Sequence, residues 1–307
     1  MKHLAKIFFY LLFSVLLGAV VAPWIYVGIQ RVPAVDFGNI ASFILEVQKM
    51  PFHRYFSRSI QVTALLLLWP TFRWLGIYDL AGCSIYPNKY ARVDLLVGIF
   101  SALLPLALLE ILFLWKGWYV FTTMVNLLLL MKFLITAVVV AMLEEYFFRG
   151  LLLGICRRAF GDQGALWLTS LFFAALHFLN MPHRGEISVD WFSGLRLLGE
   201  VGEGLPRTPL LLGAFTTLTL LGMILAWVTL RTHSLWLAIG LHTAWIFGQQ
   251  SFNQTARYAI SPADRMFPWF GVPQVHGMVP VGLIPLLSLV FTLVFLKIWC
   301  DLKHSNS

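Results

Sequence analysis

Long apolar stretches alternate with short polar segments along the whole chain. A membrane-spanning helix needs roughly 20 mainly apolar residues, and this length selects eight stretches. Prolines and glycines fall in several of the intervening segments, where helices are expected to end. The pattern therefore predicts an all-α polytopic membrane protein with about eight transmembrane helices. The expected helices are residues 7–29, 60–76, 93–115, 120–148, 164–180, 209–231, 233–250 and 278–300.

The composition supports a membrane protein. Of the 307 residues, 59% are hydrophobic and 12% are charged, whereas soluble domains carry roughly 25% charge. The net charge is +8, and the basic residues are distributed over many loops. This distribution suits lipid headgroups better than nucleic acid. The three cysteines are far apart and form no CxxC pair, so no disulfide framework or thiolate zinc site is expected. We predict a multi-pass integral membrane protein that contacts the lipid bilayer and has no nucleic-acid partner.

The N-terminal apolar run sets the expected orientation. It extends from Ile7 to about Ile29, longer than the roughly 7–15 residues of a signal-peptide core. It is therefore predicted to be the first spanning helix, with a cleaved signal peptide as the alternative. Eight crossings put both termini on one side, and the shorter basic loops favour the cytoplasmic side, at the inner membrane if the host is bacterial. Residues 1–307 are expected to form a single transmembrane domain.

Three charges interrupt the apolar pattern where the fourth expected helix ends. Residues 142–150 read Met-Leu-Glu-Glu-Tyr-Phe-Phe-Arg-Gly and follow an almost wholly aliphatic run. Charged groups at membrane depth cost several kcal/mol each unless they are paired or hydrated. Glu144, Glu145 and Arg149 are therefore candidate functional residues.

Helical spacing separates the two carboxylates. Glu145 and Arg149 are four residues apart, which favours an ion pair on one face of a helix. Glu144 is rotated by about 100° from Glu145 and is left to face a cavity, where it can act as a general base towards water. The alternative is a purely structural role, in which a buried ion pair fixes the helix register and Glu144 bonds to a backbone or hydroxyl group.

Two histidines are expected at a similar depth. Short turns at 157–163 and 231–234 make their flanking helices antiparallel neighbours. Glu144 lies 13 residues before Arg157 and His177 lies 13 residues after Gly164, or about 20 Å along straight helices. His242 lies about 13 Å from the second turn by the same measure. Each histidine alone is more often an ordinary core residue, but the shared depth of all three favours a site.

These residues resemble the CAAX protease and bacteriocin-processing family of glutamic-type intramembrane endopeptidases. The resemblance rests on Glu-Glu-x-x-x-Arg at 144–149, Phe-x-x-x-His at 173–177 and the further His242 in a late helix. It covers roughly residues 120–250, which would be the catalytic core. It implies hydrolysis of a peptide bond in a membrane-associated protein or peptide, without a cofactor.

The resemblance also implies the role of each residue. Glu144 would activate water, with Glu145 and Arg149 supporting it. His177 and His242 would orient the water and stabilise the oxyanion.

One position departs from the family pattern. The family usually has Asn or Asp four residues after the late histidine, but this chain has Ile246. Loss of one oxyanion donor typically costs about 10²–10³ in rate. Gln249 lies two helical turns beyond His242 on the same face and could reach the site, so either such a substitute donor exists or the activity is reduced.

A zinc enzyme is a weighed alternative. Two histidines and a carboxylate can hold catalytic zinc, but the helical His-Glu-x-x-His module is absent. The positive charge of Arg149 would also oppose a dication. A metal-free reaction is therefore predicted.

Two other functions stay open. A non-catalytic immunity or scaffolding protein of the same family would fit Ile246. A proton-coupled transporter would use intramembrane Glu and His, although no inverted repeat is visible. If the chain is a protease, its substrate is open between prenylated C-termini, bacteriocin-type leaders and C-terminal sorting anchors.

Overall fold

The computed structural model describes residues 2–33, 39–76, 85–124, 126–178, 188–200, 208–259, 268–269 and 281–305. The chain forms two compact units, one of residues 1–78 and 178–205 and the other of residues 79–177 and 206–307. The expected single transmembrane domain stays a prediction.

The first unit is a pair of long helices with two short ones. Its elements are α1 (Lys2–Gln30), α2 (Asn39–Gln48), α3 (Phe52–Trp74) and α7 (Ser193–Gly199). Gly18 of α1 lies directly on the backbone of α3, since a methyl group there would come 2.5 Å from the Ile60 Cα. The Tyr10 hydroxyl donates to the Ala64 carbonyl at 2.7 Å. A small residue and one polar contact thus allow the close approach typical of helices in membranes.

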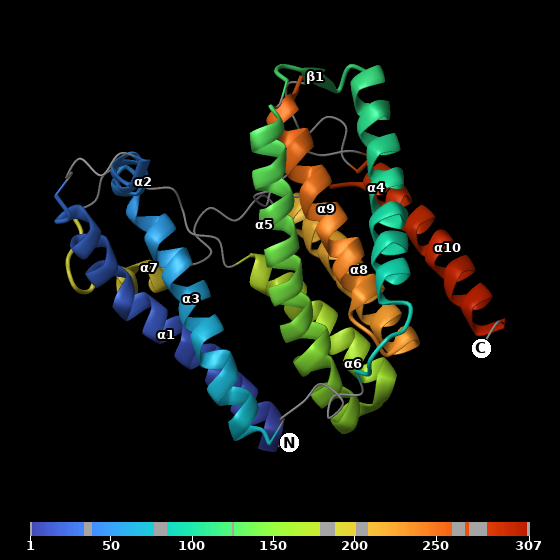
Figure 1. The fold of residues 1–307 in the computed structure, drawn as a ribbon, viewed down its shortest axis with the longest axis horizontal. Helices are drawn as coiled ribbons and strands as arrows, with labels where there is room; N and C mark the ends of the chain where they lie inside the picture. Colours follow the sequence, from blue (N-terminus) through green and yellow to red (C-terminus); the bar gives the residue numbers. More distant parts are fainter. Residues whose placement is uncertain are drawn as a thin grey trace. The chain divides into compact units, whose positions relative to one another are not determined.

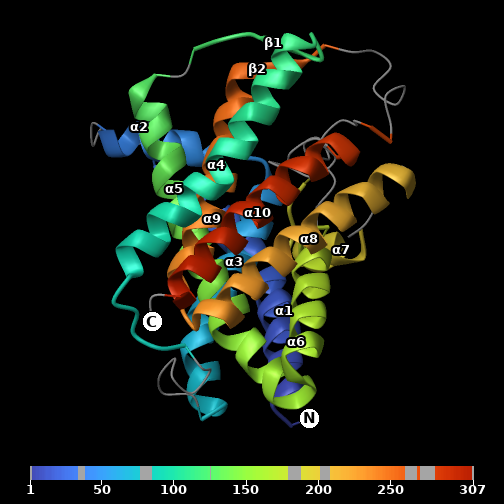
Figure 2. The ribbon, with the colours of Figure 1, turned by 90° about the vertical axis from the view of Figure 1, so that its right-hand side faces the viewer.

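The second unit contains all the candidate site residues. Its elements are α4 (Ala91–Trp115), β1 (Tyr119–Phe121), α5 (Leu127–Glu145), the π-helical segment η2 (Tyr146–Leu152), α6 (Leu153–His177), α8 (Thr208–Thr232), α9 (Trp236–Thr255), β2 (Ala256–Tyr258) and α10 (Leu283–Ser305). Figure 1 shows α9 between α5 and α4, and Figure 2 shows β1 and β2 at the same end of this unit. The two strands pair antiparallel and form the sheet of the described chain.

The all-α membrane class is confirmed. The eight expected stretches have their counterparts in α1, α3, α4, α5, α6, α8, α9 and α10. Five stretches of the described chain are long and apolar enough to cross a membrane, and one of them, Leu127–His177, contains both α5 and α6. The helices α3 and α9 are less apolar and are not among these five stretches. The number of crossings therefore stays a prediction.

The start of α5 differs from expectation. The helix was expected over 120–148, but it begins at Leu127, where the Asn126 side chain accepts a hydrogen bond from the Leu129 N–H at 2.8 Å. Asn at this position satisfies one of the unpaired N–H groups of a helix start. Residues Tyr119–Phe121 instead pair with β2. A capping residue and a local strand pairing thus shorten the helix.

The predicted turn between the fourth and fifth helices is confirmed. Gly161 within α6 has φ 71° and ψ 179°, a conformation that is essentially restricted to glycine. The chain reverses there, since Phe148 lies 13 residues before Gly161 and Phe173 lies 12 residues after it, and yet their rings pack with centroids 5.1 Å apart. The second predicted turn lies between the end of α8 at Thr232 and the start of α9 at Trp236.

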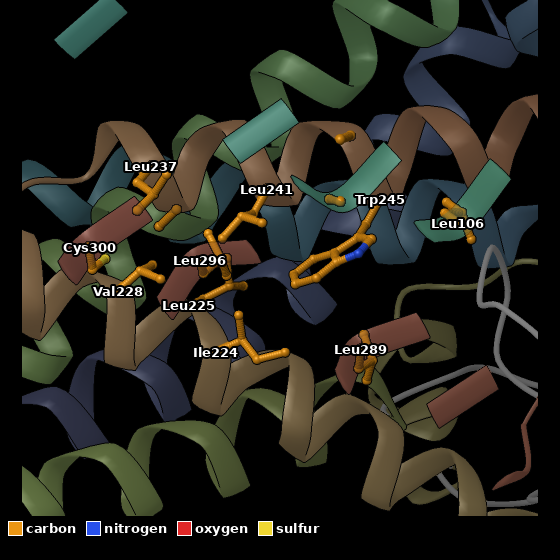
Figure 3. Packing of buried hydrophobic residues seen from close by; sticks show 13 residues of the cluster. Leu106, Ile224, Leu225, Val228, Leu237, Leu241, Trp245, Leu289, Leu296 and Cys300 are labelled. Carbon is orange, nitrogen blue, oxygen red and sulfur yellow. The ribbon is translucent and has the colours of Figure 1, made fainter. Parts of the chain in front are cut away.

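Helix α9 is the centre of the second unit. Its glycine Gly240 lies against α4, where an added Cβ would come 2.2 Å from the Leu95 carbonyl oxygen. Gly98 of α4 meets the Leu237 oxygen of α9 in the same way, at 2.4 Å. Figure 3 shows the apolar cluster in which Leu241 and Trp245 of α9 pack with Leu225 of α8 and Leu296 of α10. This packing fixes the helix that carries His242.

Candidate active site

The predicted ion pair between Glu145 and Arg149 is present and fully buried. Arg149 Nη1 lies 3.1 Å from Glu145 Oε1, and the two side chains are 1% and 0% exposed. Arg149 Nη2 also donates to the carbonyl of Gly222 in α8 at 3.1 Å. Each charge therefore has a partner, which a buried ion requires.

The ring of His242 connects this ion pair to the second carboxylate. Its Nδ1 lies 2.7 Å from Glu145 Oε1. An ionised carboxylate only accepts hydrogen bonds, so Nδ1 carries the proton that it donates. In the neutral ring Nε2 then presents a lone pair, and this atom lies 3.8 Å from Glu144 Oε2. Glu145 thus sets both the orientation and the tautomer of His242.

Glu144 has the more open position of the two carboxylates. Its side chain is 32% exposed, against 0% for Glu145, and it lines a cavity of about 210 Å³. The separation of 3.8 Å from His242 Nε2 is too long for a direct hydrogen bond. Glu144 Oε2 is itself buried and has no hydrogen-bond partner among the described residues. The arrangement therefore places an unpartnered carboxylate oxygen beside an imidazole, and a small side-chain shift is needed to admit a water between them.

His177 lies at the end of α6 and lines the same cavity. Its Nδ1 lies 2.8 Å from the Phe173 carbonyl oxygen, an acceptor, so Nδ1 donates and the neutral ring also presents a lone pair on Nε2. Glu144, His177 and His242, which were expected at a similar depth, thus line one cavity, and their catalytic roles stay a prediction.

The Phe173 ring packs against three residues of the site. Its centroid lies 4.5 Å from that of His177 and 5.9 Å from that of His242. The guanidinium carbon of Arg149 lies 4.7 Å from it, within the range of a cation–π interaction. One aromatic side chain thus contacts both imidazoles and the buried cation.

The cavity has polar ends and an apolar middle. Helical rise places Trp245 and Ile246 beyond His242 along α9, and Gln249 and Gln250 beyond those. Leu218 and Leu221 of α8 and Leu289 of α10 also line the cavity, together with Thr217 and Ser288. The position that departs from the family pattern, Ile246, is therefore part of the apolar wall.

Several features of this site carried no sequence signal. The Gly222 carbonyl that binds Arg149 is a backbone group of a distant helix. The π-helical turn at Tyr146–Leu152 interrupts what reads as regular α-helix, and such segments often occur at functional sites. The contacts of Phe173 with His242 and Arg149 follow only from packing.

A metal site is not evident in the described part of the chain, where no three His, Cys, Asp or Glu side chains come together in a metal-binding group. The metal-free reaction stays a prediction.

The comparisons with known proteins point to the same segment. Residues 126–248 match the family model described as type II CAAX prenyl endopeptidase Rce1-like. The comparisons with curated proteins and with solved structures give no match. The matched segment 126–248 carries both glutamates, the arginine and both histidines of the site, so the resemblance to the CAAX protease family is confirmed over the residues that form it.

Proposed function

We propose that this protein is an intramembrane endopeptidase that hydrolyses a peptide bond in a membrane-associated protein or peptide, using water activated by Glu144. The family supports a CAAX-type intramembrane protease function in general. The residue roles and the substrate are our proposal.

One observation carries the proposal. Glu144 Oε2 and His242 Nε2 face each other at 3.8 Å on the wall of the cavity, while Glu145 holds the other nitrogen of the same ring at 2.7 Å. This is a base beside an imidazole in a fixed orientation, and a water admitted between them would complete the set that general-base hydrolysis requires.

The reaction follows from these positions. Glu144 takes a proton from the water held against His242 Nε2, and the resulting hydroxide attacks the carbonyl carbon of the peptide bond. The tetrahedral intermediate then collapses as the C–N bond breaks, and Glu144 returns the proton to the leaving nitrogen. One water is consumed, and an acid and an amine are released. His177 supplies a second Nε2 lone pair for orienting water.

The matching family model is described as a CAAX prenyl endopeptidase, which makes a prenylated C-terminus the first substrate class to test. The apolar middle of the cavity suits aliphatic side chains next to the scissile bond. Bacteriocin-type leaders and C-terminal sorting anchors are the other two classes.

The test is Glu144→Gln in purified protein reconstituted in liposomes. The assay follows cleavage of quenched-fluorescence peptides that contain a cysteine followed by three residues, with and without a prenyl group. We expect the variant to lose cleavage while its folding and membrane insertion stay normal. Glu110→Gln is the matched control, because Glu110 is a glutamate of the apolar helix α4 that does not line the cavity.

Full cleavage by Glu144→Gln would refute the proposed role of this carboxylate. A non-catalytic scaffolding protein would keep its cellular phenotype in this variant and cleave no peptide. A transporter would instead show pH-dependent flux in the same liposomes.

A further inference from the structure

The cavity end formed by Gln249 and Gln250 has hydrogen-bonding capacity that the described chain does not use. Gln249 is 3% exposed, and its Nε2 donates to Asn253 Oδ1 at 3.2 Å. Among the described residues, no donor reaches the Oε1 atom of Gln249 or that of Gln250, although both atoms are buried. Buried polar groups in native proteins are rarely left unpaired without a reason.

The position of Gln249 along α9 decides what it can bind. It lies seven residues beyond His242, which is about 10 Å along the helix axis. Both side chains lean towards the start of the helix, so their polar groups keep about this separation. That is too far for Gln249 to contact the carbonyl under attack beside His242. The expectation that Gln249 replaces the amide absent at Ile246 therefore does not suit its position.

The same distance suits a neighbouring part of the substrate. An extended peptide rises about 3.3 Å per residue, so 10 Å corresponds to about three residues. A peptide bond must be exposed in an extended segment to be hydrolysed, and such a segment has main-chain N–H groups without partners. Within the membrane these groups have no water to bind and need acceptors from protein. The unpaired amide oxygens of Gln249 and Gln250 are acceptors of this kind.

The other groups on the cavity wall favour a main-chain ligand. Among the described residues, no Lys or Arg lines the cavity, so its walls offer no cation to a carboxylate of the substrate. Trp245 and Ile246 separate the amide end from His242 by an apolar surface. A peptide with its side chains against this surface would place an N–H at the amide end.

We propose that Gln249, held by Asn253, forms a substrate subsite that accepts a hydrogen bond from a main-chain N–H about three residues from the scissile bond. The proposal rests on the proposed hydrolysis and adds the site that selects an extended peptide. Gln250 supplies a second acceptor beside it.

The experiment removes the proposed hydrogen bond in two ways, by deleting the N–H donor of the peptide and by deleting the Gln249 acceptor of the enzyme. Prenylated quenched-fluorescence peptides are made in which one backbone N–H at a time is replaced by an ester oxygen. With the unmodified enzyme, an ester about three residues from the scissile bond should raise KM about tenfold, as expected for one lost hydrogen bond. Gln249→Leu should raise KM by a similar factor with kcat nearly unchanged, because binding is lost equally in ground and transition states.

The decisive measurement combines the Gln249→Leu variant with the ester-substituted peptide. Gln249→Leu should show no further loss with that ester, because the bond is already absent. Gln254→Leu is the matched control, since Gln254 is an exposed glutamine of the same helix that does not line the cavity; its KM and ester sensitivity should equal those of the unmodified enzyme. An unchanged KM in Gln249→Leu, or an undiminished ester effect in this variant, would overturn the subsite.

A binding assay separates this subsite from the proposed reaction. Fluorescence anisotropy measures the affinity of the uncleaved peptide for Glu144→Gln and for Glu144→Gln combined with Gln249→Leu. The second protein should bind about tenfold more weakly. Equal affinity, or no binding to either protein, refutes the subsite, whereas full cleavage by Glu144→Gln refutes the proposed reaction alone.

Discussion

Removal of the Arg149 guanidinium tests how the site is held together. Arg149→Met would leave the Glu145 carboxylate, which is 0% exposed, with His242 Nδ1 as its remaining donor. The Gly222 carbonyl would also lose its bond from Arg149. Breaking a buried ion pair by removing one partner costs about 3–5 kcal/mol, because the other charge remains buried.

The double variant separates this penalty from simple loss of packing. In Arg149→Met combined with Glu145→Leu, neither buried charge is left. We therefore expect the double variant to be about 1–3 kcal/mol more stable than the sum of the two single effects predicts. The apolar pair fills similar space, as in other cases where buried ion pairs are replaced by hydrophobic residues.

The assay is equilibrium unfolding in mixed micelles, followed by tryptophan fluorescence and circular dichroism. A loss of 3 kcal/mol corresponds to a Tm lower by roughly 6–12 °C for a unit of this size. Arg196→Met is the control: Arg196 Nη2 lies 2.7 Å from Asp190 Oδ1, but the two side chains are 56% and 52% exposed. Its Tm should change little, because solvent screens exposed pairs.

Two results would refute this reasoning. If Arg149→Met unfolds like the unmodified protein, the charge of Glu145 is not kept in a poorly solvated site. If the effects of the two single variants simply add, the two groups are not coupled despite their 3.1 Å contact.

Two further predictions follow from packing. Phe173→Leu removes the ring that contacts both imidazoles, and kcat/KM for peptide cleavage should fall about 10²-fold through misplacement of these groups, whereas Phe172→Leu next to it should have a much smaller effect. Gly240→Ala places a methyl group 2.2 Å from a backbone oxygen of α4 and should cost about 1–3 kcal/mol of stability by overpacking, measured by the Tm. Gly28→Ala, where an added methyl group meets nothing within 4 Å, should not lower the Tm, and an equal loss in both glycine variants would contradict the close α4–α9 packing.

The sequence alone was enough to place the reactive groups along the helices. Apolar runs define the helices, and the fixed rise and rotation per residue set the depth and face of each side chain. The pairing of Glu145 with Arg149 and the placement of Glu144 and His177 on one cavity, on either side of the turn at Gly161, both follow from this local geometry. The predicted start of α5 is wrong, because Tyr119–Phe121 belongs to the apolar stretch in the sequence but forms a strand with residues more than a hundred positions away.

The tertiary structure decided which side chains and backbone groups of different helices contact each other. Distances between helices depend on side-chain packing and on small residues such as Gly98 and Gly240, which helical periodicity does not encode. For this reason the bond from Glu145 to His242 Nδ1, the approach of Nε2 to Glu144 and the contact of Arg149 with the Gly222 carbonyl appear only in the folded chain. The sequence determined where the reactive groups lie along their helices, and the packing determined which of their atoms meet.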